Sequence, residues 1–295
     1  MAEGSIPVDL LNPGQVFACL GFLEAADTLL GNAEGAFDWS SATDTRFVLR
    51  ASGEESPIDV VLQFLESADV FAEAPHGSEL IAAWKDSWGV IETLPADAPY
   101  PFPEPASPAT LVAVLRTGAQ RLVLDHWGDE TRCDQVKFWA GSGGYPGSGL
   151  ARDALKLVHG QVAAAAGDPF AVNAPQSSSF RLDWRRDYIP IDTGFSLNKH
   201  GGRIETVGFP LVELLGALGL GRARPERIDP LEYRYGVVGR GAGQSGPLLP
   251  PSFLRAALGA SALPFTSRHF RMSLGWPGKV GQARSITTVT EEIRV

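Results

Sequence analysis

A basic and aromatic stretch stands out in this acidic chain. It reads WRRDYIPIDTGFSLNKHGGR and runs from Trp184 to Arg203. Basic side chains neutralise phosphates, and aromatic rings stack on nucleobases of any identity, so this combination suits single-stranded nucleic acid. Similar residues recur nearby and towards the C-terminus. The predicted nucleic-acid contacts are Arg181, Arg185, Arg186, Tyr188, Phe195, Lys199, His200, Arg203, Arg268, Arg271, Lys279 and Arg284.

The net charge of −9 conceals a strong asymmetry between the two halves of the chain. Residues 1–150 hold 7 Lys and Arg against 22 Asp and Glu, whereas residues 151–295 hold 18 against 12. Fifteen of those 18 basic residues are arginine, whose planar fork matches phosphates and carboxylates. The split favours a second half that meets nucleic acid or an acidic partner. The alternative is that the aromatic residues are core residues and the arginines neutralise the acidic half.

Catalysis by the same stretch is a second hypothesis. A metal-independent ribonuclease needs a histidine to move the 2′-hydroxyl proton and a cation to hold the phosphate. Lys199, His200 and Arg203 supply these types in a glycine-containing loop. A loop histidine beside a lysine is more often a binding or solvated residue. His200 is therefore a catalytic candidate only if the nuclease alternative holds, and no other catalytic residue is predicted.

Other classes of site find little support in the sequence. The two cysteines are far apart, and no paired-histidine or carboxylate-dense metal motif occurs. The neighbouring Asp125 and His126 could orient a base or bind a metal, but such a pair on a strand is usually structural. GAGQSG at 241–246 has the glycine spacing of a dinucleotide loop, but prolines rather than a helix follow it. Cys19 lies in an apolar run typical of an inert thiol. We expect no metal and no cofactor.

Helices and strands must position the basic stretch. Asn12 followed by Pro13 predicts a helix start, and helical periodicity also predicts a helix over 150–167. Residues 121–140 are typical of a hairpin, and two strand-like runs close the chain. Strands and helices do not alternate regularly, which predicts an α+β fold with mixed or antiparallel sheets and packed helices. A divergent RAMP-like (ferredoxin-like) arrangement is one form of it.

The charge boundary divides the chain into an acidic N-terminal α+β region, 1–149, and a basic, Arg-rich C-terminal α+β region, 150–295. The two could equally form one continuous domain. No apolar run reaches the roughly 18 to 20 residues that span a bilayer, and the N-terminus lacks the basic start of a signal peptide. We expect a cytoplasmic protein with no membrane partner.

Three segments carry a resemblance to a known family. They are NPGQVFACLGFLEAAD at 12–27, WRRDYIPIDTGFSLNKHGGRIETVGFPLVELLGALGL at 184–220, and FRMSLGWPGKVGQARSITTVTEE at 270–292. Together they resemble the small accessory or effector subunit family of type I-U (also called I-G) CRISPR-Cas systems. The resemblance implies a part in antiviral interference, with CRISPR RNA, target DNA and other Cas effector subunits as partners. GWPGKVG at 275–281 departs from the glycine-rich loop of RAMP subunits, which puts a RAMP fold and guide processing in doubt.

The leading prediction is therefore a non-enzymatic nucleic-acid-binding subunit of a type I CRISPR-Cas interference complex, contacting CRISPR RNA or target DNA. One alternative is a metal-independent endoribonuclease that processes CRISPR RNA. The other is a protein-only adaptor that binds another subunit through its acidic half.

Overall fold

The structure is a computed structural model of the chain. It describes residues 1–292 except 42, 103, 104, 106, 129–135, 140–144, 166, 177, 186–205, 245, 277–279 and 281–282. The helices are α1 (Pro13–Leu29), α2 (Pro57–Ser67), α3 (Gly147–Val158), α4 (Val162–Ala165), α5 (Pro210–Leu220) and α6 (Pro251–Leu258). None of these described helices is both long enough and apolar enough to cross a membrane.

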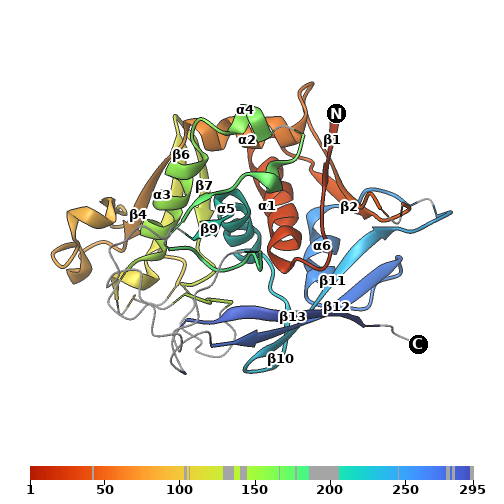
Figure 1. The fold of residues 1–295 in the computed structure, drawn as a ribbon. Coiled ribbons are helices and arrows are strands. Elements are labelled where there is room, and N and C mark those ends of the chain that lie inside the picture. The colour runs from red at the N-terminus through yellow and green to blue at the C-terminus, as the bar shows by residue number, and fades with distance from the viewer. Residues whose placement is uncertain are drawn as a thin grey trace.

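Two main sheets flank the helices (Figure 1). The larger has the order β1-β3-β2-β11-β12-β13, with β10 also pairing with β11, and the smaller has the order β5-β4-β6-β7. Both sheets are mixed, because β2 pairs in parallel with β11 and β4 in parallel with β5. The predicted α+β class is confirmed. The strands are β1 (Ala2–Pro7), β2 (Glu34–Asp38), β3 (Arg46–Ala51), β4 (Asp69–Ala74), β5 (Val90–Thr93), β6 (Val112–Thr117), β7 (Gln120–Leu124), β8 (Ala174–Pro175), β9 (Val207–Gly208), β10 (Glu226–Asp229), β11 (Glu232–Arg240), β12 (Ser267–Gly275) and β13 (Ser285–Glu292).

The start of the chain has half of a ferredoxin-like topology. The order β1-α1-β2-β3 places β3 between β1 and β2, which is a split β-α-β unit. A complete ferredoxin-like unit would next pair β4 with β1. Instead β4 pairs with β5 and β6 in the smaller sheet. The order helix, strand, strand, helix recurs later as α5-β10-β11-α6.

Both halves of the sequence build the larger sheet. Strands β1 to β3 come from the acidic region 1–149, and β10 to β13 come from the basic region 150–295. Gly239 of β11 pairs with Phe37 of β2, and Arg255 of α6 lies 2.6 Å from the carboxylate of Glu24 on α1. The change of charge at residue 149 therefore lies within a continuous set of packed elements.

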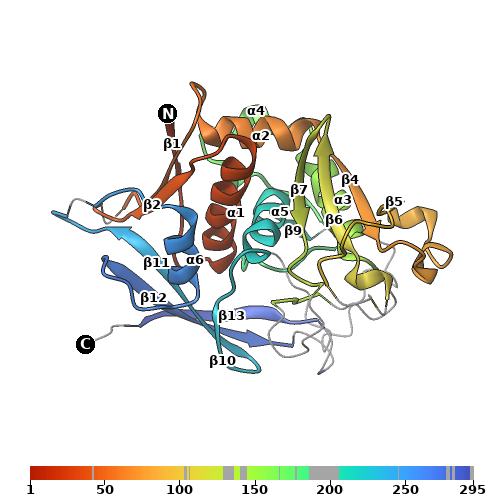
Figure 2. The ribbon, with the colours of Figure 1, turned by 180° about the vertical axis from the view of Figure 1, so that it is seen from behind.

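Helices α1 and α5 pack against each other in the middle of the molecule, as the two opposite views show (Figures 1 and 2). Their backbones touch at two glycines. A Cβ atom on Gly21 would overlap the carbonyl oxygen of Leu215, and one on Gly219 would overlap the carbonyl oxygen of Phe17. Only glycine permits this approach, because every other residue would place an atom inside the neighbouring backbone.

Tyr235 ties this helix pair to the larger sheet. Its ring lies edge-on to Phe17 of α1 at 6.0 Å and stacks on Phe270 of β12 at 5.2 Å. Its hydroxyl donates a 2.8 Å hydrogen bond to the carbonyl oxygen of Leu10, so the buried polar atom has a partner.

Two predicted elements differ from the structure. The helix expected over 150–167 is α3, which ends at Val158, and Gly160 follows in the left-handed region at φ +80°. Among the described residues β7 forms a hairpin with β6 before it, through a turn at Gly118. Residues 129–135 and 140 of the hairpin expected over 121–140 lie outside the described residues. The helix start at Pro13 is confirmed, because Asn12 Oδ1 accepts a 3.1 Å hydrogen bond from the Gly14 N–H.

We predict that Gly21→Ala destabilises the protein by at least about 2 kcal/mol, as overpacking does when backbone must move. Alanine in a helix interior normally stabilises by about 1 kcal/mol relative to glycine. A loss of stability in Gly21→Ala would therefore indicate the close helix contact. Urea unfolding followed by circular dichroism would measure the difference. Gly167→Ala is the control, because a Cβ there meets nothing within 4 Å. A Gly21→Ala protein as stable as the wild type would contradict the close helix contact.

Candidate nucleic-acid interface

The predicted contact residues fall into a described set and an undescribed set. Arg186, Tyr188, Phe195, Lys199, His200, Arg203 and Lys279 lie outside the described residues, and their assignments stay predictions. Arg181, Arg185, Arg268, Arg271 and Arg284 are described. The structure therefore describes only Trp184 and Arg185 of the basic stretch, and the chain again from Thr206 onward.

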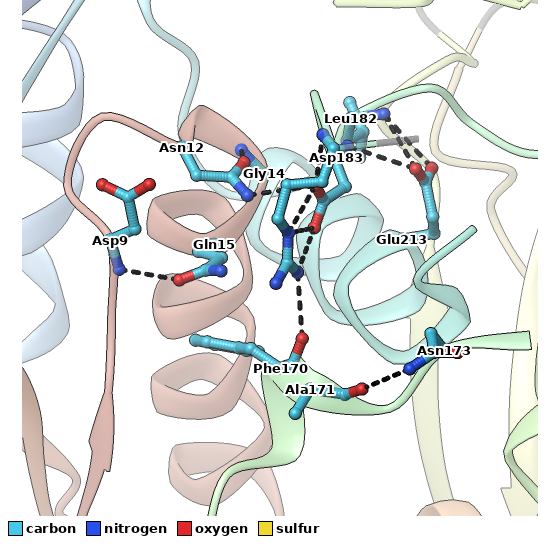
Figure 3. Close-up of polar contacts among 11 residues, drawn as sticks. Asp9, Asn12, Gly14, Gln15, Phe170, Ala171, Asn173, Leu182, Asp183 and Glu213 are labelled. Carbon is cyan, nitrogen blue, oxygen red and sulfur yellow. Dashed lines mark hydrogen bonds and ion pairs between the residues drawn. The ribbon is translucent and has the colours of Figure 1, made fainter. Parts of the chain in front are cut away.

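The segment at 182–185 is held by a polar cluster, which we call the anchor and which consists of Asn12, Asp183, Arg185 and Glu213. Asn12, Asp183 and Glu213 are buried and are labelled in Figure 3. Asp183 is fully buried. One of its carboxylate oxygens accepts a 3.0 Å hydrogen bond from Asn12 Nδ2 and a 2.9 Å bond from the Arg185 N–H. Since Asn12 also caps α1, the segment is joined directly to the start of that helix.

Glu213 joins the same segment to α5. It lies in the first turn of α5 and is 1% exposed. Its carboxylate accepts hydrogen bonds from the N–H groups of Leu182, at 3.1 and 3.2 Å, and of Asp183, at 3.2 Å. A carboxylate near a helix N-terminus is stabilised by the helix dipole. The main chain at 182–183 is thereby fixed between the beginnings of two packed helices.

Arg185 completes the anchor with its side chain. Its Nη2 lies 2.6 Å from Asp183 Oδ2 and 2.9 Å from the carbonyl oxygen of Phe170, and its guanidinium stacks 3.6 Å from the ring centre of Phe209. A buried carboxylate without its cation would be strongly destabilising, so this pairing serves the fold. The charge of Arg185 is thus paired with Asp183, although its side chain stays 32% exposed.

Arg268 and Arg271 of β12 belong to an ion-paired array on the larger sheet. Arg271 lies 3.0 Å from Glu232, and Arg268 donates two 2.6 Å hydrogen bonds to Glu291. These bonds from Arg268 hold the pKa of Glu291 below its usual value. Arg234, which lies directly opposite Arg271 in the ladder, pairs with two further carboxylates. They are Glu226 at 2.9 Å and Glu292 at 2.5 Å.

The remaining described candidates have different surroundings. Arg284 precedes β13 and donates to the carbonyl oxygens of Lys137 at 2.8 Å and Pro230 at 3.3 Å. Arg181 adopts φ +67°, and its N–H donates to Ser179 Oγ at 3.1 Å. The structure thus places Arg181 and Arg185 on the anchored segment, and Arg268, Arg271 and Arg284 on or beside the larger sheet.

Sequence reasoning missed the anchoring residues Asp183 and Glu213. Glu213 carried a signal, because it is the one charged residue in the apolar run FPLVELLGALGL at 209–220. An isolated charge in a helix that is apolar all round requires a buried partner. The sequence alone could not identify that partner, because Leu182 and Asp183 are about thirty residues away in the chain.

The Asp125–His126 pair has a structural role. His126 is buried among the rings of Trp127, Trp139 and Phe180, and its Nδ1 lies 3.2 Å from the carbonyl oxygen of Ala217. Burial, helped by the positive charge of Arg224, lowers the pKa of His126 to about 3. Across the described ranges, no group of three or more His, Cys, Asp or Glu side chains is placed to hold a metal ion. Burial also raises the pKa of Cys19 well above its ordinary value.

We predict that His126 makes folding sensitive to acid. The unfolded chain takes up a proton on this histidine below about pH 6.5, whereas the folded protein stays neutral there down to about pH 3. Stability is therefore lost as the pH falls through this window, by at most about 1.4 kcal/mol per pH unit.

Urea unfolding at pH 7 and pH 4.5 would compare the wild type with His126→Phe, which keeps an aromatic ring. The variant should lose roughly 2 kcal/mol less than the wild type between these two pH values. His159→Gln, at an exposed site, is the control for removing one histidine from the unfolded chain. Burial raises the pKa of neighbouring Asp125, but this effect is common to all three proteins. Equal acid sensitivity in His126→Phe and wild type would refute the assignment.

Comparisons with known proteins identify no relative of this chain. No family model matches it, and no curated protein and no solved structure shows a significant match.

Proposed function

We propose that this protein is a non-enzymatic nucleic-acid-binding subunit of a type I CRISPR-Cas antiviral interference complex. It would contact CRISPR RNA or target DNA and assemble with other Cas effector subunits. The proposal draws on the resemblance of the segments at 12–27, 184–220 and 270–292, and on the excess of arginine in the second half of the chain.

The observation that carries the proposal is the anchor at the start of the basic stretch. Hydrogen bonds from Leu182, Asp183 and Arg185 fix the main chain at 182–185 beside the first turns of the two packed helices. A binding segment that begins at a rigid point loses less conformational entropy when it meets its partner. The first half of the protein, through α1, then serves to hold the contact region of the second half.

The basic residues of the stretch take different roles in this proposal. Arg186, Lys199 and Arg203 would neutralise phosphates, and Tyr188 and Phe195 would stack on bases or brace the segment. Arg185 would hold the anchor, because its guanidinium already pairs with Asp183. His200 would be a further binding residue. The ribonuclease alternative depends on His200 and gains no support from the described residues.

The protein-only adaptor is favoured by one specific observation. The arginines of the larger sheet pair with carboxylates of the same sheet: Arg234, Arg268 and Arg271 with Glu226, Glu232, Glu291 and Glu292. An array neutralised in this way gives little net charge to attract phosphates. Such a surface is suited to a protein partner, so the adaptor remains the second candidate function.

Salt-dependent binding separates the two candidates. We predict that the wild type binds a single-stranded oligonucleotide, measured by fluorescence anisotropy, with an affinity that falls as salt rises. Each phosphate contact in a single strand contributes about 0.7 to the slope of log affinity against log salt. Arg186→Ala combined with Lys199→Ala should therefore flatten the slope by about 1.4.

Two single variants serve as comparisons. Arg121→Ala removes an exposed arginine that pairs with Glu73 on the smaller sheet, and it should leave the slope unchanged. Arg185→Ala should lower the urea midpoint and leave the slope of the remaining folded protein unchanged, because in this proposal its guanidinium stays paired with Asp183. A double variant with wild-type affinity and slope would refute the contact stretch. A wild type that binds no nucleic acid at any salt would favour the adaptor.

A further inference from the structure

We infer that Trp184 is a stacking platform for an unpaired nucleobase at the start of the contact stretch. This inference deepens the proposed function and rests on it. Trp184 is one of the described residues. It would add an uncharged contact with a base to the phosphate contacts predicted for the basic residues of the stretch.

The first observation is exposure. Trp184 has 36% of its surface exposed. The other aromatic side chains within the described ranges are more deeply covered, including Trp127, Tyr233, Tyr235 and Phe270, which are at most 1% exposed. Tryptophan is the largest apolar ring system among the side chains, and leaving it in water forfeits the stabilisation that burial would give. Trp184, as the most exposed aromatic side chain within the described ranges, is therefore a candidate contact for a partner.

The second observation is that the backbone on both sides of Trp184 is fixed. Before it, the Asp183 N–H donates to Glu213 and the Asp183 side chain is bonded to Asn12. After it, the Arg185 N–H donates to Asp183, and the Arg185 guanidinium binds the same carboxylate. Trp184 thus lies between two residues whose hydrogen bonds hold the main chain in place. A tryptophan has two side-chain torsions, so a ring on such a backbone loses little entropy when a partner covers it.

The third observation is the chemistry of the neighbouring residues. Trp184 directly precedes Arg185 and Arg186, and the charge of Arg185 is already paired with Asp183. The next basic residue in the sequence is Arg186, for which the proposed function predicts a phosphate contact. A ring followed by a cation matches a nucleotide, which offers a flat base and a phosphate at a short separation. Stacking needs no particular base, and this suits a subunit that must accept any guide or target sequence.

The test uses the full chain and labelled single-stranded RNA and DNA oligonucleotides of mixed sequence. Base stacking on one aromatic ring is worth about 1–3 kcal/mol per base by alanine substitution. Trp184→Ala should accordingly weaken binding by between about 5-fold and about 140-fold. The slope against salt should stay unchanged, because no phosphate contact is lost. Trp184→Phe should recover most of the affinity, since a smaller ring still stacks.

Two further measurements separate stacking from a structural effect. Ile228→Ala removes a side chain of matched exposure, 37%, from β10 and should bind like the wild type. Oligonucleotide binding should quench intrinsic tryptophan fluorescence in the wild type, and Trp184→Phe should lose that quenching while still binding. Circular dichroism would confirm that each variant is folded.

The outcomes distinguish this inference from the proposed function. If the wild type binds and folded Trp184→Ala binds equally well, the inference is overturned and the proposed function stands. If Trp184→Ala keeps its nucleic-acid affinity but no longer captures a Cas subunit, Trp184 is a protein contact and the inference is overturned. If the wild type binds no nucleic acid, both fall together.

Discussion

The backbone contact between α1 and α5 is the constraint on which the rest of the structure depends. Gly21 and Gly219 let the two helices approach until main-chain atoms of one meet those of the other. This contact brings the first turns of both helices to the segment at 182–185, where Asn12 and Glu213 hold it. It also joins the acidic first half to the basic second half, because α1 and α5 come from opposite sides of the charge boundary. A helix pair with larger residues at these positions would stand further apart and could not hold the same segment from both sides.

The arginines of the second half can neutralise carboxylates within the protein or bind phosphates of a partner. Two groups of described arginines form ion pairs within the protein. On the larger sheet the strand registers place arginines beside glutamates, so the pairs Arg268–Glu291 and Arg271–Glu232 stabilise the sheet. At the anchor, Arg185 neutralises a buried aspartate that would otherwise be costly. The basic residues from Arg186 to Arg203 lie outside the described residues, and their contact with nucleic acid stays a prediction. The ion pairs of Arg185, Arg268 and Arg271 agree with the alternative in which arginines neutralise acids within the protein.

The sequence was sufficient for local features and insufficient for distant ones. Asn12 and Pro13 mark the start of α1, and the alternating patterns of the last two strands are read correctly, because caps and periodicity act over a few residues. The end of α3 was misplaced, since nothing local distinguishes the left-handed Gly160 from a glycine tolerated inside a helix. The bond between Asn12 and Asp183 spans 171 residues, and the parallel pairing of β2 with β11 is similarly distant. Such contacts depend on how the elements pack, and the local patterns of a single sequence do not predict which distant residues meet.

The most direct test of the central claim is co-purification of this chain with its proposed complex. The tagged protein would be expressed together with the neighbouring effector genes and a CRISPR RNA, then isolated at about 0.15 M and about 0.5 M salt, where exposed charge contacts are screened to different extents. Our account predicts that RNA of one defined length and the effector proteins are recovered with it at the lower salt. Recovery of the protein alone, without RNA or other subunits at both salts, would contradict the claim that it is a subunit of a ribonucleoprotein.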